Sequence, residues 1–350
     1  MKPSAVLFTQ NFPAPKKLGE ELLLIYDEVL PKKSEEFKKW MKQIPLRYAV
    51  QAGEGLKSID LFPDHISKIT TLCEKASVSK LTIVVVGGGS VGDFGGFVAS
   101  ILKRGVRLIH LPSTWLAAID SAHGGKTALN VGGAKNQIGT FYPATEVVLV
   151  KSLLLSQPPS RTFEGFGELL KIALIEGGIL WAQLSREYEV NAEVLWKYLE
   201  AGIKAKYKVV KKDPEEKKGL RHVLNLGHTV GHVLESYYEL PHGISINYGL
   251  EFALRWSVEK KIMAREDFDR LQRQPVMAYL LSASADQLWD VKANVLKEFR
   301  RLLLNDKKKT KSETLRFVFI KKAGQTVIKE VPVDDILVEI CRQREEELNG

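Results

Sequence analysis

A buried strand that runs through a glycine-rich turn into a helix constrains the fold of this chain more than any other feature. The apolar run Leu81–Val86 is typical of a buried strand, and residues 94–102 predict a helix. Between them lies Gly-Gly-Gly-Ser-Val-Gly-Asp at residues 87–93. Backbone N–H groups at such a helix N-terminus can bind phosphate, because the helix dipole makes that end partly positive. The segment therefore predicts an α/β unit with a phosphate or dinucleotide loop, and the alternative is a tight turn without a ligand.

The glycine spacing does not describe an ordinary Rossmann site. Gly87, Gly89 and Gly92 match G-x-G-x-x-G. The acid expected about 20 residues later is missing, because that region reads Leu-Ile-His-Leu-Pro. Another acid, Asp27, ends the apolar run at residues 22–26, where a strand could present it to a ribose hydroxyl. The alternative for Asp27 is a solvent-exposed turn.

The pattern of elements changes near the middle of the chain. Strand and helix signals alternate up to about residue 155, which is typical of an α/β unit with a largely parallel sheet. After residue 159 the pattern is mostly helical to about residue 300, and residues 315–331 predict a β-hairpin. We therefore predict an α/β nucleotide-binding domain over residues 1–157 and a mainly α-helical domain over residues 158–350.

Composition excludes several classes of protein. Of the 350 residues, 45% are hydrophobic and 27% charged, which is typical of a soluble globular protein. Cys73 and Cys341 lie far apart and outside any C-x-x-C pair, which argues against a disulfide scaffold and fits a reducing compartment. We see neither a signal peptide nor a membrane-spanning run, and expect a cytoplasmic protein with no membrane partner. The net charge of +9 comes from lysine clusters without a nucleic-acid motif, so we expect a phosphorylated small molecule and no nucleic acid.

Three histidines between residues 228 and 242 have the density of a metal site. His228 and His232 are four residues apart, which places both on one face of a helix, and His242 follows after one loop. Glu168 is an acid in an otherwise apolar helical stretch, with Lys171 one turn later. Imidazole and carboxylate ligands suit a catalytic Zn²⁺ with an open position. The alternative is that the histidines cap helices or form hydrogen bonds in the core.

A polar segment rich in glycine lies between the glycine turn and this second region. Glycines let a ligand approach the backbone closely, and lysines provide point charges for phosphate or carboxylate. Apolar neighbours on both sides favour a ligand-binding segment over a solvated loop. Its polar members are Asp120, Lys126, Asn130, Lys135 and Asn136.

Together these motifs resemble the 3-dehydroquinate synthase family over about residues 22–330. The resemblance implies a homodimer of chains with an α/β NAD-binding domain and a mainly helical metal-binding domain. It also implies conversion of 3-deoxy-D-arabino-heptulosonate 7-phosphate to 3-dehydroquinate and phosphate, in the shikimate pathway of aromatic amino acid biosynthesis. In the family, this proceeds by transient NAD-dependent oxidation, phosphate elimination, reduction and aldol cyclisation. The segments that carry the resemblance are 87–93, 112–114, 120–126, 135–139, 168–171, 220–232, 242–243 and 306–308.

The resemblance also implies roles for individual residues. Those that match NAD contacts are Asp27, Glu54, Lys57, Gly88, Gly89, Ser90, Val91, Asp93, Ser113, Thr114, Asp120, Lys126 and Lys135. Those that match the ligands of Zn²⁺ (or Co²⁺) are Glu168, His228 and His242. Those that match substrate contacts are Lys126, Asn136, Lys171, Lys206, Arg221, Asn225, His232 and Lys307. Arg104 matches an arginine that reaches the substrate phosphate across the dimer.

The chain departs from the family pattern at several positions. His123 stands where the family usually has a small or aliphatic residue, and Ile244 stands where a glutamate usually follows His-Gly. Ser113 and Trp115 replace the usual threonine and frequent leucine. One additional residue precedes Arg221, so that Lys204 and Lys208 are alternatives to Lys206.

Three other functions compete with the dehydroquinate reading. Related sugar phosphate cyclases make 2-deoxy-scyllo-inosose or an epi-valiolone and tend to change the residues that meet the substrate carboxylate. An NAD- and metal-dependent polyol dehydrogenase would need no phosphate-binding lysines and would accumulate NADH. The binding activity of a non-catalytic basic protein would not depend on Glu168 or His228. The presence of Arg221, Asn225, His232 and Lys307 favours dehydroquinate.

Overall fold

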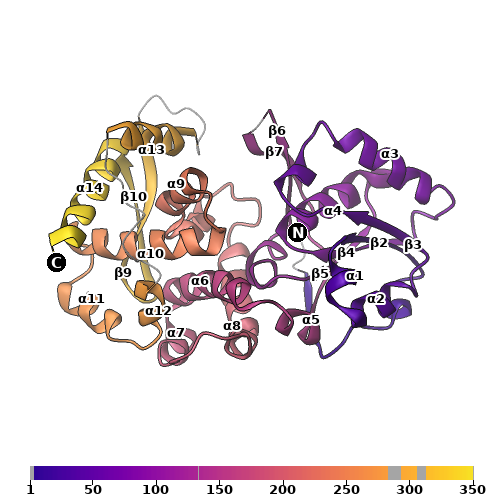
Figure 1. The fold of residues 1–350 in the computed structure, drawn as a ribbon, viewed down its shortest axis with the longest axis horizontal. Coiled ribbons are helices and arrows are strands. Elements are labelled where there is room, and N and C mark those ends of the chain that lie inside the picture. The colour runs from indigo at the N-terminus through magenta and orange to yellow at the C-terminus, as the bar shows by residue number, and fades with distance from the viewer. Residues whose placement is uncertain (1–3, 133, 283–292, 306–312, 350) are drawn as a thin grey trace. The chain divides into compact units, whose positions relative to one another are not determined.

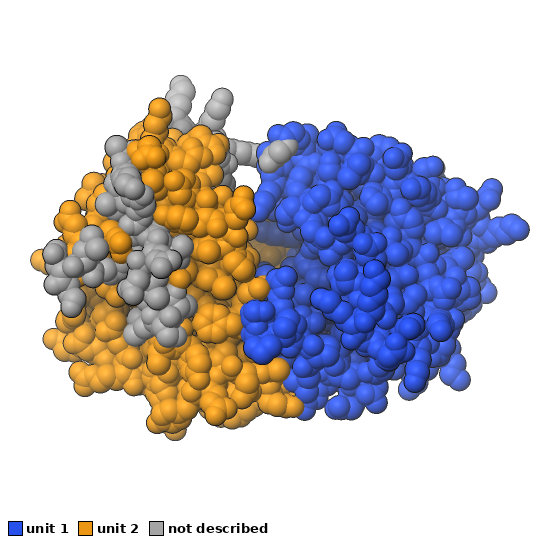
Figure 2. Space-filling model, viewed as in Figure 1, with its two compact units in different colours: residues 1–161 blue, residues 162–350 orange. Residues whose placement is uncertain are grey.

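The computed structural model describes residues 4–132, 134–282, 293–305 and 313–349 (Figure 1). The chain divides into two compact units, Met1–Arg161 and Thr162–Gly350 (Figure 2). The division falls after residue 161, whereas the sequence places it after residue 157. The predicted fold class is confirmed, because unit 1 contains a parallel sheet and unit 2 is mainly helical. Within the described ranges, no helix is both long and apolar enough to cross a membrane.

Unit 1 is organised around a parallel six-stranded sheet with the strand order β1-β8-β5-β4-β2-β3. All residues of the central strand β4 are buried, which explains its continuous apolar sequence. The sequence pattern does not predict the edge strands β1 and β3, because they are short and largely exposed. The strands are β1 (Ala5–Thr9), β2 (Glu21–Asp27), β3 (Leu46–Val50), β4 (Leu81–Gly87), β5 (Arg107–Pro112) and β8 (Glu146–Val150).

The helices of unit 1 include the one that the glycine turn predicts. It is α4 (Gly89–Ile101), and it begins earlier than the apolar residues alone suggest. Helix α2 (Glu35–Met41) buries Phe37 and Trp40 in the core that also contains β4. The others are η1 (Pro15–Lys17), α1 (Leu30–Lys33), η2 (Glu54–Lys57), α3 (Phe62–Leu72), η3 (Leu102–Arg104), the π-helix η4 (Ala117–Ser121) and α5 (Lys151–Leu155).

The polar segment after η4 forms an antiparallel hairpin of β6 (Lys126–Val131) and β7 (Ala134–Phe141). Nearly all residues of β7 are exposed, so the segment lacks the alternating apolar pattern of a half-buried strand. For this reason the sequence pattern does not predict these strands. The hairpin carries Lys126 and Lys135 near the starts of its two strands.

Unit 2 packs helices around one hairpin, β9 (Thr314–Lys322) and β10 (Gln325–Pro332), which the sequence predicted. Trp256 packs against Phe317 with ring centroids 4.7 Å apart, and this contact joins a central helix to β9. The helices are α6 (Pro159–Glu176), α7 (Gly178–Leu184), α8 (Ala192–Val210), η5 (Leu220–Asn225), α9 (His228–Tyr238), α10 (His242–Glu259), α11 (Arg265–Gln272), α12 (Met277–Ser282), α13 (Ala293–Asn305) and α14 (Val333–Asn349).

Glycines allow three of these helices to approach backbone to backbone. A Cβ on Gly249 of α10 would lie 1.8 Å from the carbonyl oxygen of Gly227, at the start of α9. A Cβ on Gly243 of α10 would lie 2.1 Å from the carbonyl oxygen of Glu164 in α6. No side chain fits in either space. The close approach places the polar side chains of α6, α9 and α10 beside one another.

Candidate functional site

The three predicted histidines of unit 2 lie together. His228 begins α9, His232 follows one turn later, and His242 begins α10. One ring nitrogen of each lies within 4.8 Å of those of the other two. The helix-face spacing of His228 and His232 is thus confirmed, and the close packing of α9 and α10 brings His242 to the same place.

Glu168 of α6 completes this cluster. Its side chain is fully buried, and its Oε1 lies 3.4 Å from Nε2 of His228 and 3.6 Å from Nε2 of His242. Lys171 Nζ lies 2.5 Å from the other oxygen, Oε2. Among the described residues, neither carboxylate oxygen accepts a well-formed hydrogen bond. A buried carboxylate whose Oε1 faces two imidazole nitrogens, while a lysine pairs with its Oε2, is part of a ligand set that fits a divalent metal ion.

Electrostatics in the cluster favour the metal-binding forms of Glu168 and His228 but oppose that of His242. Burial opposes ionisation of Glu168, but Lys171, His242 and His228 together hold its pKa well below the usual range. Burial and the nearby Lys171 charge lower the pKa of His228, which keeps the imidazole neutral. Burial also acts to lower the pKa of His242, but Glu168 and Glu235 outweigh it and raise that pKa to about 10. A metal at His242 therefore competes with a proton.

Two residues near this cluster were missed by sequence reasoning. Glu235 Oε2 lies 2.8 Å from Nδ1 of His242, and its helical spacing from His232 was the available signal. His222 joins η5 to the β9 strand, because its Nε2 lies 2.9 Å from the carbonyl oxygen of Arg316. The other ring nitrogen of His222 lies 3.2 Å from Nδ2 of Asn225. No local pattern marks His222 as a support for Asn225.

The predicted substrate residues of unit 2 include two buried cations besides Lys171. Arg221 of η5 donates from Nη1 to the carbonyl oxygen of Pro214 (3.0 Å), and its buried Nε has no acceptor among the described residues. Lys206 of α8 is 4% exposed. Its alternatives Lys204 and Lys208 are exposed and form ion pairs with Glu200 and Glu176, which favours Lys206. Lys307 lies outside the described residues.

The glycine turn of unit 1 leaves the start of α4 open. Gly88 is the N-cap, and as a glycine it has no side chain that could accept a hydrogen bond from the first turn of the helix. A Cβ on Gly88 would lie 3.3 Å from the side chain of Thr114, which itself accepts a hydrogen bond from Ala117 N (3.2 Å). Ser90 Oγ accepts from Gly53 N at 3.0 Å. Backbone N–H groups at a helix start that is capped by a glycine, in the narrow space beside Gly88, fit a phosphate group.

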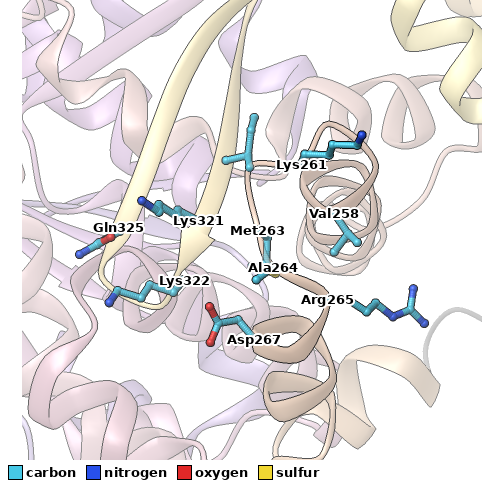
Figure 3. Close-up of a pocket in the computed structure, with 10 residues that line it drawn as sticks. Val258, Lys261, Met263, Ala264, Arg265, Asp267, Lys321, Lys322 and Gln325 are labelled. Carbon is cyan, nitrogen blue, oxygen red and sulfur yellow. The ribbon is translucent and has the colours of Figure 1, made fainter.

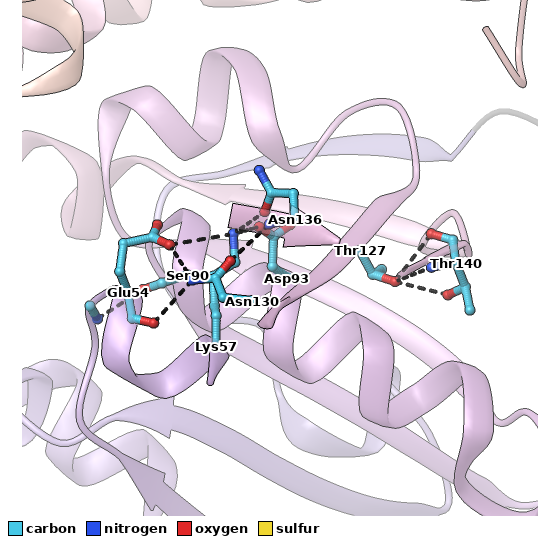
Figure 4. Close-up of polar contacts among 9 residues, drawn as sticks. Glu54, Lys57, Ser90, Asp93, Thr127, Asn130, Asn136 and Thr140 are labelled. Carbon is cyan, nitrogen blue, oxygen red and sulfur yellow. Dashed lines mark hydrogen bonds and ion pairs between the residues drawn. The ribbon is translucent and has the colours of Figure 1, made fainter. Parts of the chain in front are cut away.

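A polar network lies beside this turn (Figure 4). Lys57 is 3% exposed, and its Nζ contacts Asp93 Oδ2 at 2.8 Å and Asn136 Oδ1 at 2.6 Å. Burial raises the pKa of Asp93, although Lys57 acts in the opposite direction. The predicted residues Lys57, Asp93 and Asn136 are thus brought together from three separate segments.

Asn130, which the sequence placed in the polar ligand-binding segment, contacts two other members of this network. Its Nδ2 donates to Glu54 Oε2 (2.8 Å), and its Oδ1 accepts from the backbone N–H of Asn136 (2.9 Å). Asn136 has a φ of +56°, a left-handed conformation that this hydrogen bond supports. The contact ties the β6–β7 hairpin to η2.

The remaining predicted residues of unit 1 lie near the ends of its elements. Asp27 ends β2, accepts from Val29 N (3.2 Å), and has a pKa that burial raises. Ser113 is buried directly after β5, and Asp120 lies in the π-helix η4. Arg104 has a φ of 72° within a left-handed turn before Gly105.

The departures from the family pattern have local explanations. His123 is buried, and its Nε2 lies 2.8 Å from the carbonyl oxygen of Ala118, so it serves as a core hydrogen-bonding residue. Trp115 is fully buried. Ile244 brings no acid to the metal cluster, but Glu235 contacts His242 from α9.

A separate cavity of about 710 Å³ lies in unit 2 between the α10–α11 connection and the β9–β10 hairpin (Figure 3). Its lining includes Lys261, Arg265, Asp267, Lys321 and Lys322. It contains none of the predicted site residues.

Comparison with solved structures defines the class of fold. A 2-deoxy-scyllo-inosose synthase complexed with carbaglucose-6-phosphate, NAD⁺ and Co²⁺ is 22% identical, with a TM-score of 0.79 over 97% of this chain and 98% of the other. A 2-epi-5-epi-valiolone synthase from Streptomyces hygroscopicus with NAD⁺ and Zn²⁺ bound is 19% identical, with a TM-score of 0.81 over 99% and 98%. The chain therefore has the fold of the sugar phosphate cyclases.

Sequence comparison defines the family within this class. Models of the 3-dehydroquinate synthase N-terminal and C-terminal domains match residues 47–164 and 165–309. The 3-dehydroquinate synthase of Alkaliphilus oremlandii is 35% identical over 82% of this chain and 78% of its own length. A bifunctional shikimate kinase/3-dehydroquinate synthase of Thermotoga maritima is 35% identical over 73% of this chain, which spans about half (51%) of that relative. The chain belongs to the 3-dehydroquinate synthase family, and these matches confirm the expected enzyme function at the level of that family.

Proposed function

We propose that this protein converts 3-deoxy-D-arabino-heptulosonate 7-phosphate to 3-dehydroquinate and phosphate, as a cytoplasmic homodimer in aromatic amino acid biosynthesis. The observation that carries the proposal is the buried Glu168 carboxylate, which faces His228 and His242 beside the buried Lys171. A carboxylate–imidazole set with an adjacent cation suits a site that binds a metal ion and an anionic substrate together.

The cofactors would bind to the residues that the family resemblance assigns. The open first turn of α4 and the network around Lys57 and Asp93 would hold NAD, and Glu168, His228 and His242 would hold Zn²⁺ or Co²⁺. When bound, NAD supplies a reversible hydride acceptor and the metal supplies a Lewis acid. Arg104 would serve the substrate phosphate of the other subunit.

The chain's own cations would bind and orient the substrate, which carries both a phosphate and a carboxylate. Arg221 is buried, and its Nε lacks an acceptor among the described residues, so a ligand anion can supply one. A guanidinium binds such anions through two parallel hydrogen bonds. Lys171 and Lys206 add two more buried charges, while His232 offers an imidazole to a substrate hydroxyl. Fixed charges around one small anion bind and orient it without later reorganisation.

A test of substrate class separates this proposal from the alternatives. We would compare phosphate release from 3-deoxy-D-arabino-heptulosonate 7-phosphate with release from glucose 6-phosphate, which lacks the carboxylate. We expect release from the first alone, and a loss of at least about tenfold in kcat/KM for Arg221→Gln. The control Arg265→Gln removes an arginine that is 69% exposed and should leave the rate unchanged. Faster release from glucose 6-phosphate would favour a related cyclase, and steady NADH production from polyols would favour a dehydrogenase.

A further inference from the structure

We propose that Glu235 is a positioning residue that holds His242 in the orientation and tautomer required for metal binding. The inference rests on the proposed metal site and goes beyond its three ligands. Glu235 lies on α9, and its Oε2 is 2.8 Å from Nδ1 of His242 at the start of α10. It reaches the ligand from a neighbouring helix without joining the ligand set itself.

The geometry divides the two nitrogens of the His242 ring between two partners. Nδ1 faces Glu235, while Nε2 faces Glu168 Oε1 at 3.6 Å. A hydrogen atom on Nδ1 that is donated to Glu235 leaves Nε2 with its lone pair directed at the metal position. Glu235 thereby selects the tautomer in which Nε2 is the ligand atom, and its charge makes that nitrogen a better donor.

His228 provides an internal comparison. Its Nδ1 lies 3.2 Å from the carbonyl oxygen of Leu226, and its Nε2 lies 3.4 Å from the same Glu168 oxygen. Both histidines therefore present Nε2 to Glu168 and Nδ1 to an acceptor. The acceptor of His228 is a neutral carbonyl, whereas that of His242 is a carboxylate.

His242 has more need of such support than His228. Its side chain is 28% exposed, against 14% for His228, so packing restricts its ring less. Within the family resemblance, the position directly after Gly243 would carry an acid, but this chain has Ile244 there. Glu235 supplies a carboxylate to the His242 ring from α9, the helix that also carries His228 and His232.

The test measures metal affinity in the full-length protein. Apoprotein is titrated with Zn²⁺ in competition with a chromophoric chelator, for wild type, Glu235→Ala and Glu235→Gln, with folding checked by circular dichroism. Loss of such a supporting carboxylate weakens metal binding by about 10–100-fold, and we expect this for Glu235→Ala. The amide of Glu235→Gln can still accept from Nδ1 but carries no charge, so we expect an intermediate loss. This variant also keeps the proposal testable if Glu235→Ala does not fold.

The matched control is Glu239→Gln, which removes an exposed carboxylate at the end of the same helix. We expect it to bind Zn²⁺ as wild type does, because a general loss of negative charge does not reorient His242. Affinities of both Glu235 variants within twofold of wild type, or an equal loss in Glu239→Gln, would overturn the proposal. The readout does not depend on the substrate, so a protein whose Zn²⁺ affinity depends on Glu235 but which does not act on the proposed substrate would refute the proposed function alone.

Discussion

Removal of the buried charge on Lys171 should destabilise the metal-free protein strongly. Lys171 is 1% exposed, and its Nζ lies 2.5 Å from the fully buried Glu168 carboxylate. Breaking a buried ion pair from one side costs about 3–5 kcal/mol, because the other charge remains buried. His242 lies 3.6 Å from Glu168 and has a pKa raised to about 10, so it offsets part of the loss. We therefore expect the lower limit, about 3 kcal/mol, for Lys171→Met.

Calorimetry of the chelator-treated protein would measure this loss. At about 2–4 °C per kcal/mol for a unit of this size, the transition of unit 2 should fall by roughly 6–12 °C. The double variant Lys171→Met/Glu168→Gln should recover most of the decrease, because the Glu168 carboxylate that lost its partner is then removed as well. The control Lys204→Met breaks a surface pair with Glu200, in which both side chains are exposed, and should cost less than about 1 kcal/mol. The reasoning would be refuted if Lys171→Met matched this control, or if the double variant were no more stable than the single one.

Three further predictions concern other parts of the molecule. Gly249→Ala should destabilise unit 2 by at least about 1–3 kcal/mol and weaken Zn²⁺ binding, because a Cβ at this position would lie 1.8 Å from the carbonyl oxygen of Gly227. An unchanged melting temperature and an unchanged Zn²⁺ affinity would contradict the described packing of α9 and α10. Burial lowers the pKa of His110 from its usual 6.5 to about 4. The free energy of unfolding should therefore fall as pH falls from 6.5 toward 4, because the unfolded chain binds a proton at His110 before the folded protein does. A His110 ring that titrates above pH 6 in NMR spectra would show that water reaches it in the folded protein. If Arg104 acts across a dimer, the inactive variants Arg104→Gln and Glu168→Gln should regain about a quarter of wild-type activity when they are mixed equally under subunit exchange. Half of the dimers are then mixed, and each mixed dimer contains one intact site out of two. No regain of activity would place Arg104 in its own subunit's site or exclude the dimer.

Local patterns of residues along the chain made much of the fold predictable. The continuous apolar run of β4 followed by glycines could only be a buried strand that turns into a helix, and both elements are present. The four-residue spacing of His228 and His232 placed both rings on one face of α9. These predictions succeeded because each depends on the local period of one element.

Features that depend on neighbours in space were not predictable from the sequence. The β6–β7 hairpin is polar and exposed, so it has no apolar pattern, and its pairing depends on Gly139, where a Cβ would lie 2.1 Å from Thr127 O. The contact of Glu235 with His242 and that of Asn130 with Glu54 each join separate segments. Tertiary packing determines these contacts, and the spacing of residues along the chain does not reveal them.

The most direct test of the proposed function is phosphate release from 3-deoxy-D-arabino-heptulosonate 7-phosphate in the presence of NAD⁺ and Zn²⁺, with NADH absorbance followed in the same sample. The proposal predicts sustained phosphate release without accumulation of NADH, and loss of release when a chelator is added or when Glu168 is replaced by alanine. A folded, metal-loaded protein that releases no phosphate from this substrate would contradict the proposed function.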